Sequence, residues 1–340
     1  MNLAKFPRRR YTAGPTPIER IPRFSEALGG PQVYIKRDDL LGLTGGGNKT
    51  RKLEFLVADA LAQGCDTLIT CGGIQSNHCR LTLAAAVKEG LNCWLVLSEP
   101  SSGAYRADAN GNIFLYHLLG AGKIKIVPDG VDWPTELRVA EAEAVAAGHR
   151  PYVIPMGGSN AIGALGYAAC AAEIMGQCFD QSLSVDRIVV AGGSAGTLAG
   201  TLLGLELLHF DVPVTAISVV NPNEELLADA KRIAADTAAY LGVDAKVRPD
   251  AVTCYDAYIG PGYGQPTKEM VAAVKLLARS EGILLDPTYT GKAMAGLIDL
   301  ARQGVIRPEE NVLFLHTGGS PSLYAATHLF AESPAGGHEE

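Results

Sequence analysis

The sequence lacks the patterns that mark metal centres and disulfide frameworks. Its seven cysteines are odd in number and include no C-x-x-C pair, and its seven histidines show no H-x-x-x-H spacing. We therefore expect reduced, buried cysteines, a cytoplasmic location and no metal site.

Long apolar runs and long basic stripes are also missing. The longest apolar stretch, at 196–208, is interrupted by Glu206 and is too short to span a bilayer. The first ten residues are basic, but no apolar run follows them, so we expect no signal peptide. A formal net charge of −7 argues against nucleic acid or an anionic membrane as a partner. A small-molecule substrate is the favoured alternative.

The composition and the hydrophobic pattern indicate an α/β protein. The chain has 340 residues, 47% of them apolar, which suffices for one large or two medium domains. Short β-branched runs end in glycine-rich turns and lead into helical runs rich in alanine and leucine. Strands are expected at 33–37, 67–71, 93–97, 123–127, 151–155, 187–191 and 312–315, and irregular stretches at 99–111, 221–225 and 248–264.

Strands that alternate with helices at this spacing predict parallel sheets flanked by helices. In such sheets ligands bind beyond the carboxyl ends of the strands, where the glycine-rich loops of this chain would lie. Several such loops at one edge predict one shared site.

The loop at 44–52 carries an unusual set of charges. Its glycines allow close approach of a ligand, and a helical run follows directly. Lys49, Arg51 and Lys52 would crowd the first turn of that helix, where the macrodipole disfavours cations. An anion such as phosphate would offset them, or one lysine amine would be bound as an imine to a carbonyl compound. A plain surface loop is the alternative, whereas Asn48 breaks the spacing of a nucleotide P-loop.

Other candidate residues have both a functional and a structural interpretation. The glycine-rich run at 192–197 could cradle a phosphate or could form a tight strand-to-helix turn. Ser76 could be a nucleophile or proton carrier, or it could cap a helix. Tyr263 and Tyr289 could be acids or aromatic walls of a site, or ordinary half-buried tyrosines.

Taken together, the motifs are far more specific. The chain resembles the pyridoxal-phosphate enzymes of the tryptophan-synthase β-subunit fold and, within them, the D-cysteine desulfhydrase and 1-aminocyclopropane-1-carboxylate deaminase family. The resemblance covers roughly residues 6–329. It is carried, in order, by GGNK at 46–49, QSNH at 75–78, GGSAGT at 192–197, GYG at 262–264, DPTYTG at 286–291 and HTGG at 316–319.

The resemblance implies two domains around a pyridoxal 5'-phosphate. Residues 1–49 and 161–340 would form a large cofactor-binding domain, and residues 50–160 a small domain that closes over the substrate. Lys49 would be the Schiff-base lysine, Asn77 would bond the pyridoxal hydroxyl, and Thr317 would lie near the pyridine nitrogen. The phosphate would be held by Lys52 and by the loop residues Gly193, Ser194, Ala195, Gly196 and Thr197. The expected catalytic and substrate-binding residues are Lys49, Ser76, Asn77, His78, Ser159, Tyr263 and Tyr289.

Two positions favour β-elimination over ring opening. The cyclopropane deaminases have a glutamate after the second tyrosine, where this chain has Thr290, and a hydroxyl cannot keep a pyridine ring protonated as a carboxylate does. Their loop ends in Ser-Asn-Gln, where this chain has His78. The expected reaction is the conversion of D-cysteine to pyruvate, ammonia and sulfide.

Other functions stay open at this point. An L-cysteate sulfo-lyase is one, with Thr44, Thr288 or Ser159 as donors to the sulfonate. A cyclopropane deaminase and a non-catalytic protein that binds pyridoxal phosphate or an amino acid are others. The family also implies a homodimer.

Overall fold

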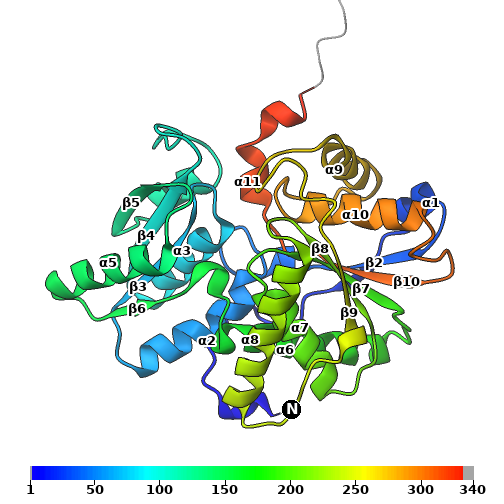
Figure 1. Ribbon diagram of the computed structural model, residues 1–340, viewed down its shortest axis with the longest axis horizontal. Helices are drawn as coiled ribbons and strands as arrows, with labels where there is room; N and C mark the ends of the chain where they lie inside the picture. Colours follow the sequence, from blue (N-terminus) through cyan, green and yellow to red (C-terminus); the bar gives the residue numbers. More distant parts are fainter. Residues whose placement is uncertain (1, 332–340) are drawn as a thin grey trace, which may run out of the picture.

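A computed structural model describes residues 2–331, which form two sheets with helices between and around them (Figure 1). The strands are β1 (Ile18–Arg20), β2 (Gln32–Lys36), β3 (Thr67–Gly73), β4 (Asn92–Glu99), β5 (Lys123–Pro128), β6 (Pro151–Val153), β7 (Arg187–Gly192), β8 (Val214–Ser218), β9 (Val252–Tyr255) and β10 (Asn311–Leu315). A six-stranded sheet has the order β1-β2-β10-β7-β8-β9, and a four-stranded sheet has the order β5-β4-β3-β6.

Both sheets are parallel apart from one edge strand. β1 runs antiparallel to β2, and every other pair is parallel. The carboxyl ends of neighbouring strands in each sheet therefore share one edge, as the alternation of strands and helices predicts.

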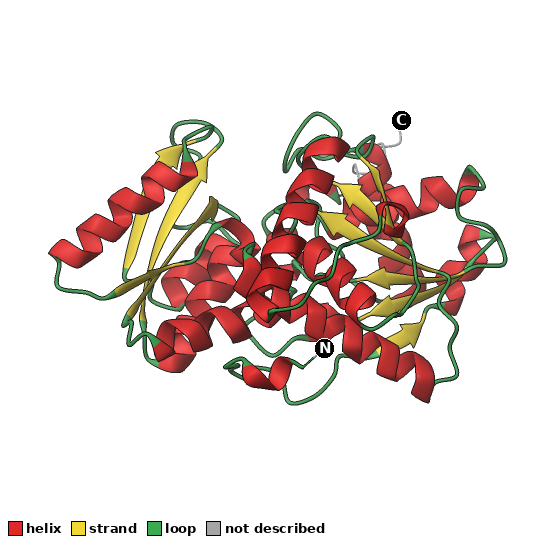
Figure 2. Ribbon diagram, turned by 60° about the horizontal axis from the view of Figure 1, so that its bottom comes forward, coloured by secondary structure: helices red, strands yellow, loops and turns green. Residues whose placement is uncertain are grey.

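The helices cover both faces of each sheet (Figure 2). They are α1 (Pro22–Leu28), α2 (Lys49–Ala62), α3 (Asn77–Glu89), α4 (Asn112–Leu118), α5 (Trp133–Ala146), α6 (Ala161–Asp180), α7 (Gly196–Leu207), α8 (Asn223–Leu241), α9 (Lys268–Glu281), α10 (Thr290–Arg302) and α11 (Ser320–Tyr324). α6 packs against α7 and α2, so these central helices connect the two sheets.

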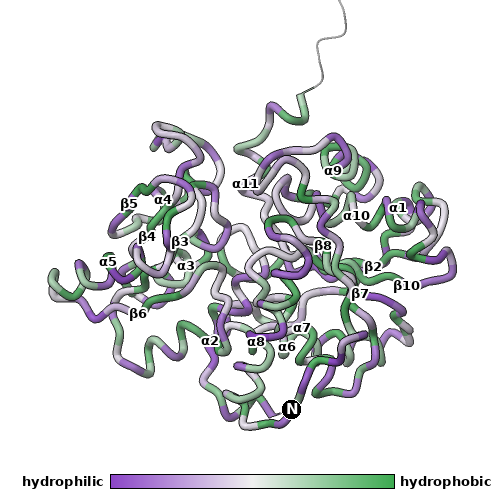
Figure 3. Tube along the Cα trace, in the orientation of Figure 1, coloured by the Kyte–Doolittle hydropathy of each residue, from purple (hydrophilic) through white to green (hydrophobic). Residues whose placement is uncertain are grey.

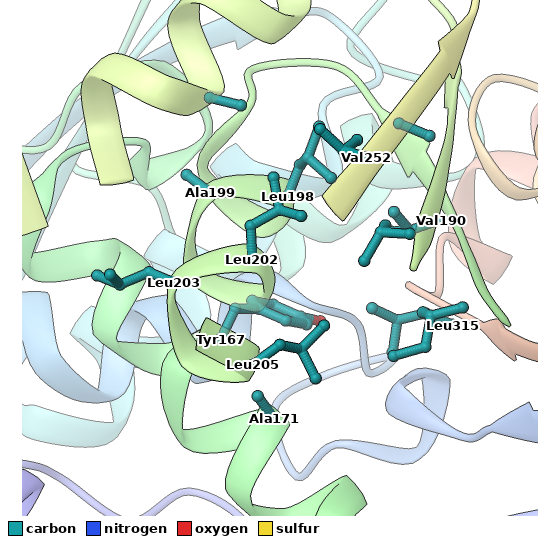
Figure 4. Packing of buried hydrophobic residues seen from close by; sticks show 14 of the residues in the cluster. Tyr167, Ala171, Val190, Leu198, Ala199, Leu202, Leu203, Leu205, Val252 and Leu315 are labelled. Carbon is teal, nitrogen blue, oxygen red and sulfur yellow. The ribbon is translucent and has the colours of Figure 1, made fainter. Parts of the chain in front are cut away.

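Each sheet has an apolar cluster on both faces. On the large sheet, side chains of α6, α7 and α8 cover one face, and side chains of α1, α9 and α10 cover the other. In the first of these clusters, Tyr167 and Leu202 lie near Val190 and Leu315 of the sheet (Figure 4). On the small sheet, α2 and α3 cover one face and α5 the other. Apolar residues accordingly concentrate in the strands and the inner helices (Figure 3).

The strands expected from the sequence are all present, with ends shifted by a few residues. Two of the stretches expected to be irregular are regular in part, which corrects the prediction. α8 begins at Asn223, and β9 lies within 248–264 because its backbone pairs with β8. The four-stranded sheet lies inside the predicted small domain. The division of domains at residues 50 and 160 stays a prediction, and its first boundary falls at the start of α2.

One helix has the composition of a membrane span. Among the described residues, α6 is long and apolar enough to cross a bilayer, but more than half of its most apolar segment is buried inside the protein. Core helices of this kind pass the same test, and the contacts of α6 with α7 and α2 account for its apolar residues.

A buried charge cluster holds the start of α2. Arg51 forms a two-pronged pair with Asp38, with Nε–Oδ2 and Nη2–Oδ1 distances of 2.7 Å each, and contacts Glu173 of α6 at 2.9 Å. Tyr167 donates to Asp38 at 2.7 Å. Burial alone would raise the pKa of Asp38, but the charge and hydrogen bonds of Arg51 hold it below its ordinary value. The cluster thus joins the short 3-10 helix Asp38–Leu40, which follows β2, to α2 and α6.

We expect Asp38→Asn to lower the free energy of unfolding by about 3–5 kcal/mol, because it leaves a buried arginine without its closest anion. Since the pKa of Asp38 is lowered in the folded state, its stabilisation is present at neutral pH and is lost as pH falls through that value. Urea unfolding at pH 7 and at decreasing pH checks both points.

The matched control is Asp108→Asn, which removes the carboxylate of the exposed Arg106–Asp108 pair. It should leave the unfolding midpoint unchanged. Equal effects of the two substitutions at pH 7 would contradict the assignment.

Candidate active site

The carboxyl ends of both sheets open into one cavity of about 340 Å³. Its walls come from the end of β4, from the segments that follow β3, β5, β6, β7, β8, β9 and β10, from the loop before α10 and from the start of α2. The lining includes Asn48, Lys49, Ser76, Asn77, His78, Asp129, Trp133, Gly193, Ser194, Ala195, Thr197, Tyr263, Tyr289 and Thr317. Loops that are far apart in the sequence therefore form one site, as predicted.

Lys49 lies in the first turn of α2 and reaches the cavity. The preceding Asn48 donates its backbone N–H to the carbonyl of Thr317 and its side-chain amide to Thr197 Oγ1, at 3.0 and 2.9 Å. Desolvation lowers the pKa of Lys49 to about 8, and the Asp286 carboxylate opposes this shift. A substantial fraction of the amine is then neutral near pH 7–8, which a nucleophile toward a carbonyl group requires.

The loop after β7 has the form of an anion cradle at the N-terminus of α7. Ala195 adopts φ +61°, a conformation that is uncommon outside glycine. At Gly196 a Cβ atom would come within 2.6 Å of Ser159 Oγ and 2.8 Å of Lys52 Nζ, so only glycine fits there. First-turn N–H groups have no partner within a helix, and the dipole adds positive potential.

Lys52 lies beside this cradle and has no carboxylate partner within residues 2–331. Only 1% of it is exposed, and its ammonium donates to the carbonyl of Gly157 at 3.0 Å and to Ser159 Oγ at 3.1 Å. Desolvation, followed by the charge of Lys49, lowers its pKa well below the ordinary value. A phosphate at the cradle would supply the missing anion, so these residues fit a phosphorylated cofactor.

Ser76 and His78 open α3 at the opposite wall. Ser76 is the N-cap residue, and its Oγ accepts a hydrogen bond from the N–H of Cys79 at 3.2 Å. The cap predicted as the structural interpretation is therefore present, while the hydroxyl also lines the cavity. His78 Nε2 lies 2.7 Å from Thr70 Oγ1, and desolvation lowers the pKa of His78 well below its ordinary value. At neutral pH it is uncharged.

Tyr263 and Tyr289 meet at the mouth of the cavity. Their hydroxyl oxygens are 2.7 Å apart, and the rings pack edge to face with centroids 5.9 Å apart. Desolvation raises the pKa of Tyr289 well above its ordinary value, and Tyr263 and Asp286 raise it further. The tyrosine pair is therefore neutral at pH 7, and its chemistry suits a hydrogen-bond or proton donor rather than an anionic base.

One predicted residue makes its contacts on the phosphate side of the cavity. Ser159, predicted at the substrate side, has its Oγ 2.9 Å from Ser194 Oγ, 3.2 Å from Gly196 N and 3.1 Å from Lys52 Nζ. These contacts place it at the anion cradle, because the turn at 156–158 brings it there. Lys52 and Gly196 support the cradle from behind, and the remaining predicted site residues line the cavity itself.

Asp129 and Trp133 are among the lining residues that sequence patterns missed. Both follow β5, and their position after a strand was the available signal. Among residues 2–331, Lys49 and Asp129 are the only Lys, Arg, Asp or Glu residues in the cavity lining. Thr290 turns away from the cavity: it is fully buried, and its hydroxyl donates to Asp286 Oδ1 at 2.8 Å.

No group of three or more potential metal ligands is present among residues 2–331. All seven cysteines are free thiols, and only Cys65 is more than slightly exposed.

Comparisons with known proteins agree with this geometry. The family model described as pyridoxal-phosphate dependent enzyme matches residues 10–318. Two curated relatives from strains of Klebsiella pneumoniae, both named D-cysteine desulfhydrase, are 48% identical over 326 residues and 46% identical over 325 residues. In each case the match covers 95% of this chain and 97% of the relative. A crystal structure described as an ACC deaminase homologue superimposes with a TM-score of 0.85 at 40% identity, covering 96% of both chains.

We expect the amine of Lys49 to react with an acylating reagent with a midpoint near pH 8 after removal of bound cofactor, because burial lowers its pKa to about 8. Asp286→Asn should move this midpoint to lower pH, since the Asp286 carboxylate favours the charged amine. Peptide mass mapping of the modified protein across pH measures both midpoints. A midpoint that is insensitive to Asp286 would contradict the electrostatic account.

Proposed function

Since the chain belongs to the pyridoxal-phosphate-dependent enzyme family, we propose that it is a β-elimination lyase that converts D-cysteine and water to pyruvate, ammonia and sulfide. The observation that carries the proposal is the set of groups around Lys49. A lysine with a low pKa shares a cavity with a serine hydroxyl and two neutral tyrosines. The relatives that are 46–48% identical carry the same activity in their names.

The cavity has two ends, one suited to the cofactor phosphate and one suited to the substrate carboxylate. At one end Lys52, Ser159 and the loop at 193–197 would hold the cofactor phosphate, and Lys49 would bind the cofactor covalently. Asn77 would donate to the ring hydroxyl, and Thr317 would lie at the pyridine nitrogen. When bound, pyridoxal phosphate supplies the electron sink for the electron pair left when the substrate loses its α-proton.

Asn77 is also the first residue of α3, and the backbone N–H groups at this start of the helix would hold the substrate carboxylate at the other end. The first N–H groups of the helix and its dipole favour an anion there. Ser76 adds a hydroxyl that lines the cavity. His78 is neutral, so it shapes the wall and contributes no charge to the binding of the carboxylate.

Proton transfer would involve Lys49, Ser76 and the two tyrosines. Lys49 on one face or Ser76 on the other would remove the α-proton. As the carbon–sulfur bond breaks, the departing sulfide needs a proton donor, and the hydroxyl pair of Tyr263 and Tyr289 is neutral and hydrogen-bonded at 2.7 Å. The tyrosine pair therefore suits the role of acid.

Ring opening of a cyclopropane amino acid is less well supported. It would need a carboxylate at the position of Thr290 to strengthen the electron sink. The Thr290 hydroxyl is instead used within its own turn, where it also accepts from the N–H of Asp286 at 2.8 Å.

The second candidate substrate, L-cysteate, carries a second permanent negative charge. Within the part of the chain that the structure describes, no arginine lines the cavity, and the one carboxylate there, Asp129, would repel a sulfonate. Neither Thr44 nor Thr288 lines the cavity among the described residues, and Ser159 lies at the cradle. The three donors considered for a sulfonate are therefore not assembled around one.

The proposal also includes the location of the protein, its oligomeric state and the closure of its small domain. We place the protein in the cytoplasm on its cysteine pattern, and we propose a homodimer on the resemblance of the sequence. The small domain would close the cleft over the substrate and exclude water, with Trp133 and Met156 on the closing walls.

The first test is pyruvate release by the cofactor-loaded protein from D-cysteine, L-cysteine, L-cysteate and 1-aminocyclopropane-1-carboxylate. We expect turnover of D-cysteine, and a loss of at least about 100-fold in Lys49→Ala because general-base and covalent roles are both removed. Lys88→Ala, on the exposed last turn of α3, is the matched control and should keep full activity.

The other outcomes of this assay are distinct. Turnover of L-cysteate alone would overturn the substrate proposal and keep the site. Oxobutyrate from the cyclopropane amino acid would overturn the argument from Thr290. A yellow, borohydride-reducible protein without turnover would indicate a binding protein.

A second test concerns charge in the cavity. Asp129→Asn should raise kcat/KM for L-cysteate relative to D-cysteine by roughly 3- to 10-fold, since it removes a repulsive charge at a solvated position. Asp108→Asn lies outside the cavity and should leave this ratio unchanged. Steady-state kinetics with both substrates measure the ratio, and an unchanged ratio in Asp129→Asn would rule out Asp129 as a determinant.

A further inference from the structure

Arg80 of α3 is a fully buried cation without a carboxylate partner among the described residues. Its Nη2 donates to the carbonyl of Gly46 at 2.7 Å, and its Nη1 donates to Asn112 Oδ1 and Asn77 Oδ1 at 3.1 and 3.3 Å. Its Nε has no partner. Arg51, which is similarly buried, is neutralised by two carboxylates. An unneutralised buried charge is costly, so its position calls for an explanation.

The neighbours of Arg80 fix the orientation of the Asn77 amide. Asn77 Oδ1 also accepts from Asn112 Nδ2 at 2.9 Å. Because a guanidinium can only donate, the oxygen of Asn77 must face Arg80, and its NH2 group must face away. Asn112 is itself held by Gln75, which bonds it at 2.8 Å through both its backbone and its side-chain oxygen. Asn77 lines the cavity, so it presents a donor there.

The same guanidinium connects the two walls of the cavity. Gly46 belongs to the loop before Lys49, whereas Asn77 begins the helix on the other side. Two other ionisable groups influence Arg80, Tyr116 of α4 and Asp286 in the loop before α10, and neither forms an ion pair with it. Desolvation lowers the pKa of Arg80 to about 10, so it stays cationic at neutral pH.

We propose that Arg80 is a positioning residue for the bound cofactor: it orients Asn77 to donate to the ring hydroxyl oxygen, and its unneutralised charge favours the oxyanion form of that oxygen. The inference rests on the cofactor site proposed above and is independent of which amino acid is the substrate. It explains why a buried arginine bonds to an amide oxygen and a carbonyl instead of a carboxylate.

The test is a pH titration of the absorbance of the cofactor-loaded protein without substrate. Arg80→Met should raise the pH midpoint by about one unit, because a nearby cation favours the more negative, deprotonated form of the chromophore. Arg80→Lys keeps the charge and should stay near the wild-type midpoint. Asn112→Ala removes one bond to Asn77 but keeps the charge, and should also leave the midpoint in place.

A merely structural role gives a different result. Arg80→Met would then lower the unfolding temperature while its pH midpoint matched that of the wild type, and this outcome would overturn the proposal. If D-cysteine is not turned over, the substrate proposal fails while the titration is still readable, so the two failures are distinguishable.

A second variant tests the proposal if Arg80→Met binds the cofactor poorly. Arg80→Gln keeps an amide donor and removes the charge, and equilibrium dialysis of its cofactor-free form gives Kd for pyridoxal phosphate and for the 3-O-methyl analogue. We expect the preference for pyridoxal phosphate over the analogue to fall about tenfold relative to the wild type. An equal loss of affinity for both ligands would contradict an action through the ring hydroxyl.

Discussion

Three cations share the first turn of α2, at the end of the helix where the backbone dipole is already positive. Each of these cations has a different environment in the structure. Arg51 is neutralised by Asp38 and Glu173, and the amine of Lys49 has a pKa near 8. Lys52 faces the anion cradle without a carboxylate. The partners of Arg51 come from the short 3-10 helix after β2 and from α6, so the ion pairs that neutralise it also hold the start of α2, where Lys49 lines the cavity and Lys52 lies beside the cradle.

Parallel strands bring the loops of the site to the same cavity as the start of α2. Each loop of the site is a weak signal alone, since a glycine-rich turn or a capped helix occurs in many proteins. The strands of each sheet point their carboxyl ends in one direction, so loops after β3, β7 and β10 meet at the same cavity. The hydrogen bonds of Asn48 to Thr197 and Thr317 join the start of α2 directly to the segments after β7 and β10.

The sequence was informative about elements and loops, and less so about partners across the fold. Hydrophobic periodicity located most strands, and the motifs located Lys49, Ser76 and the tyrosine pair. It did not show that Asp38 and Glu173 neutralise Arg51, because those residues are far apart in the chain and their approach depends on helix packing. The contacts of Ser159 with the cradle were not evident for the same reason, since they depend on a turn with positive φ at two glycines. Short strands such as β9 depend on pairing with a neighbour, which local patterns do not reveal.

Two residues, His78 and Thr290, favoured elimination over ring opening because of the groups that they do not supply to the site. His78 bonds Thr70 and carries no charge, and Thr290 bonds Asp286 within its own turn. Neither residue presents a carboxylate to a pyridine ring. The unneutralised charge of Arg80 lies behind Asn77, on the side proposed for the ring hydroxyl, while neutral Thr317 faces the side proposed for the ring nitrogen. A cofactor held in this way would be a weaker electron sink than one with a protonated ring, and a leaving group that departs readily, such as a thiolate, suits it better than a strained carbon–carbon bond.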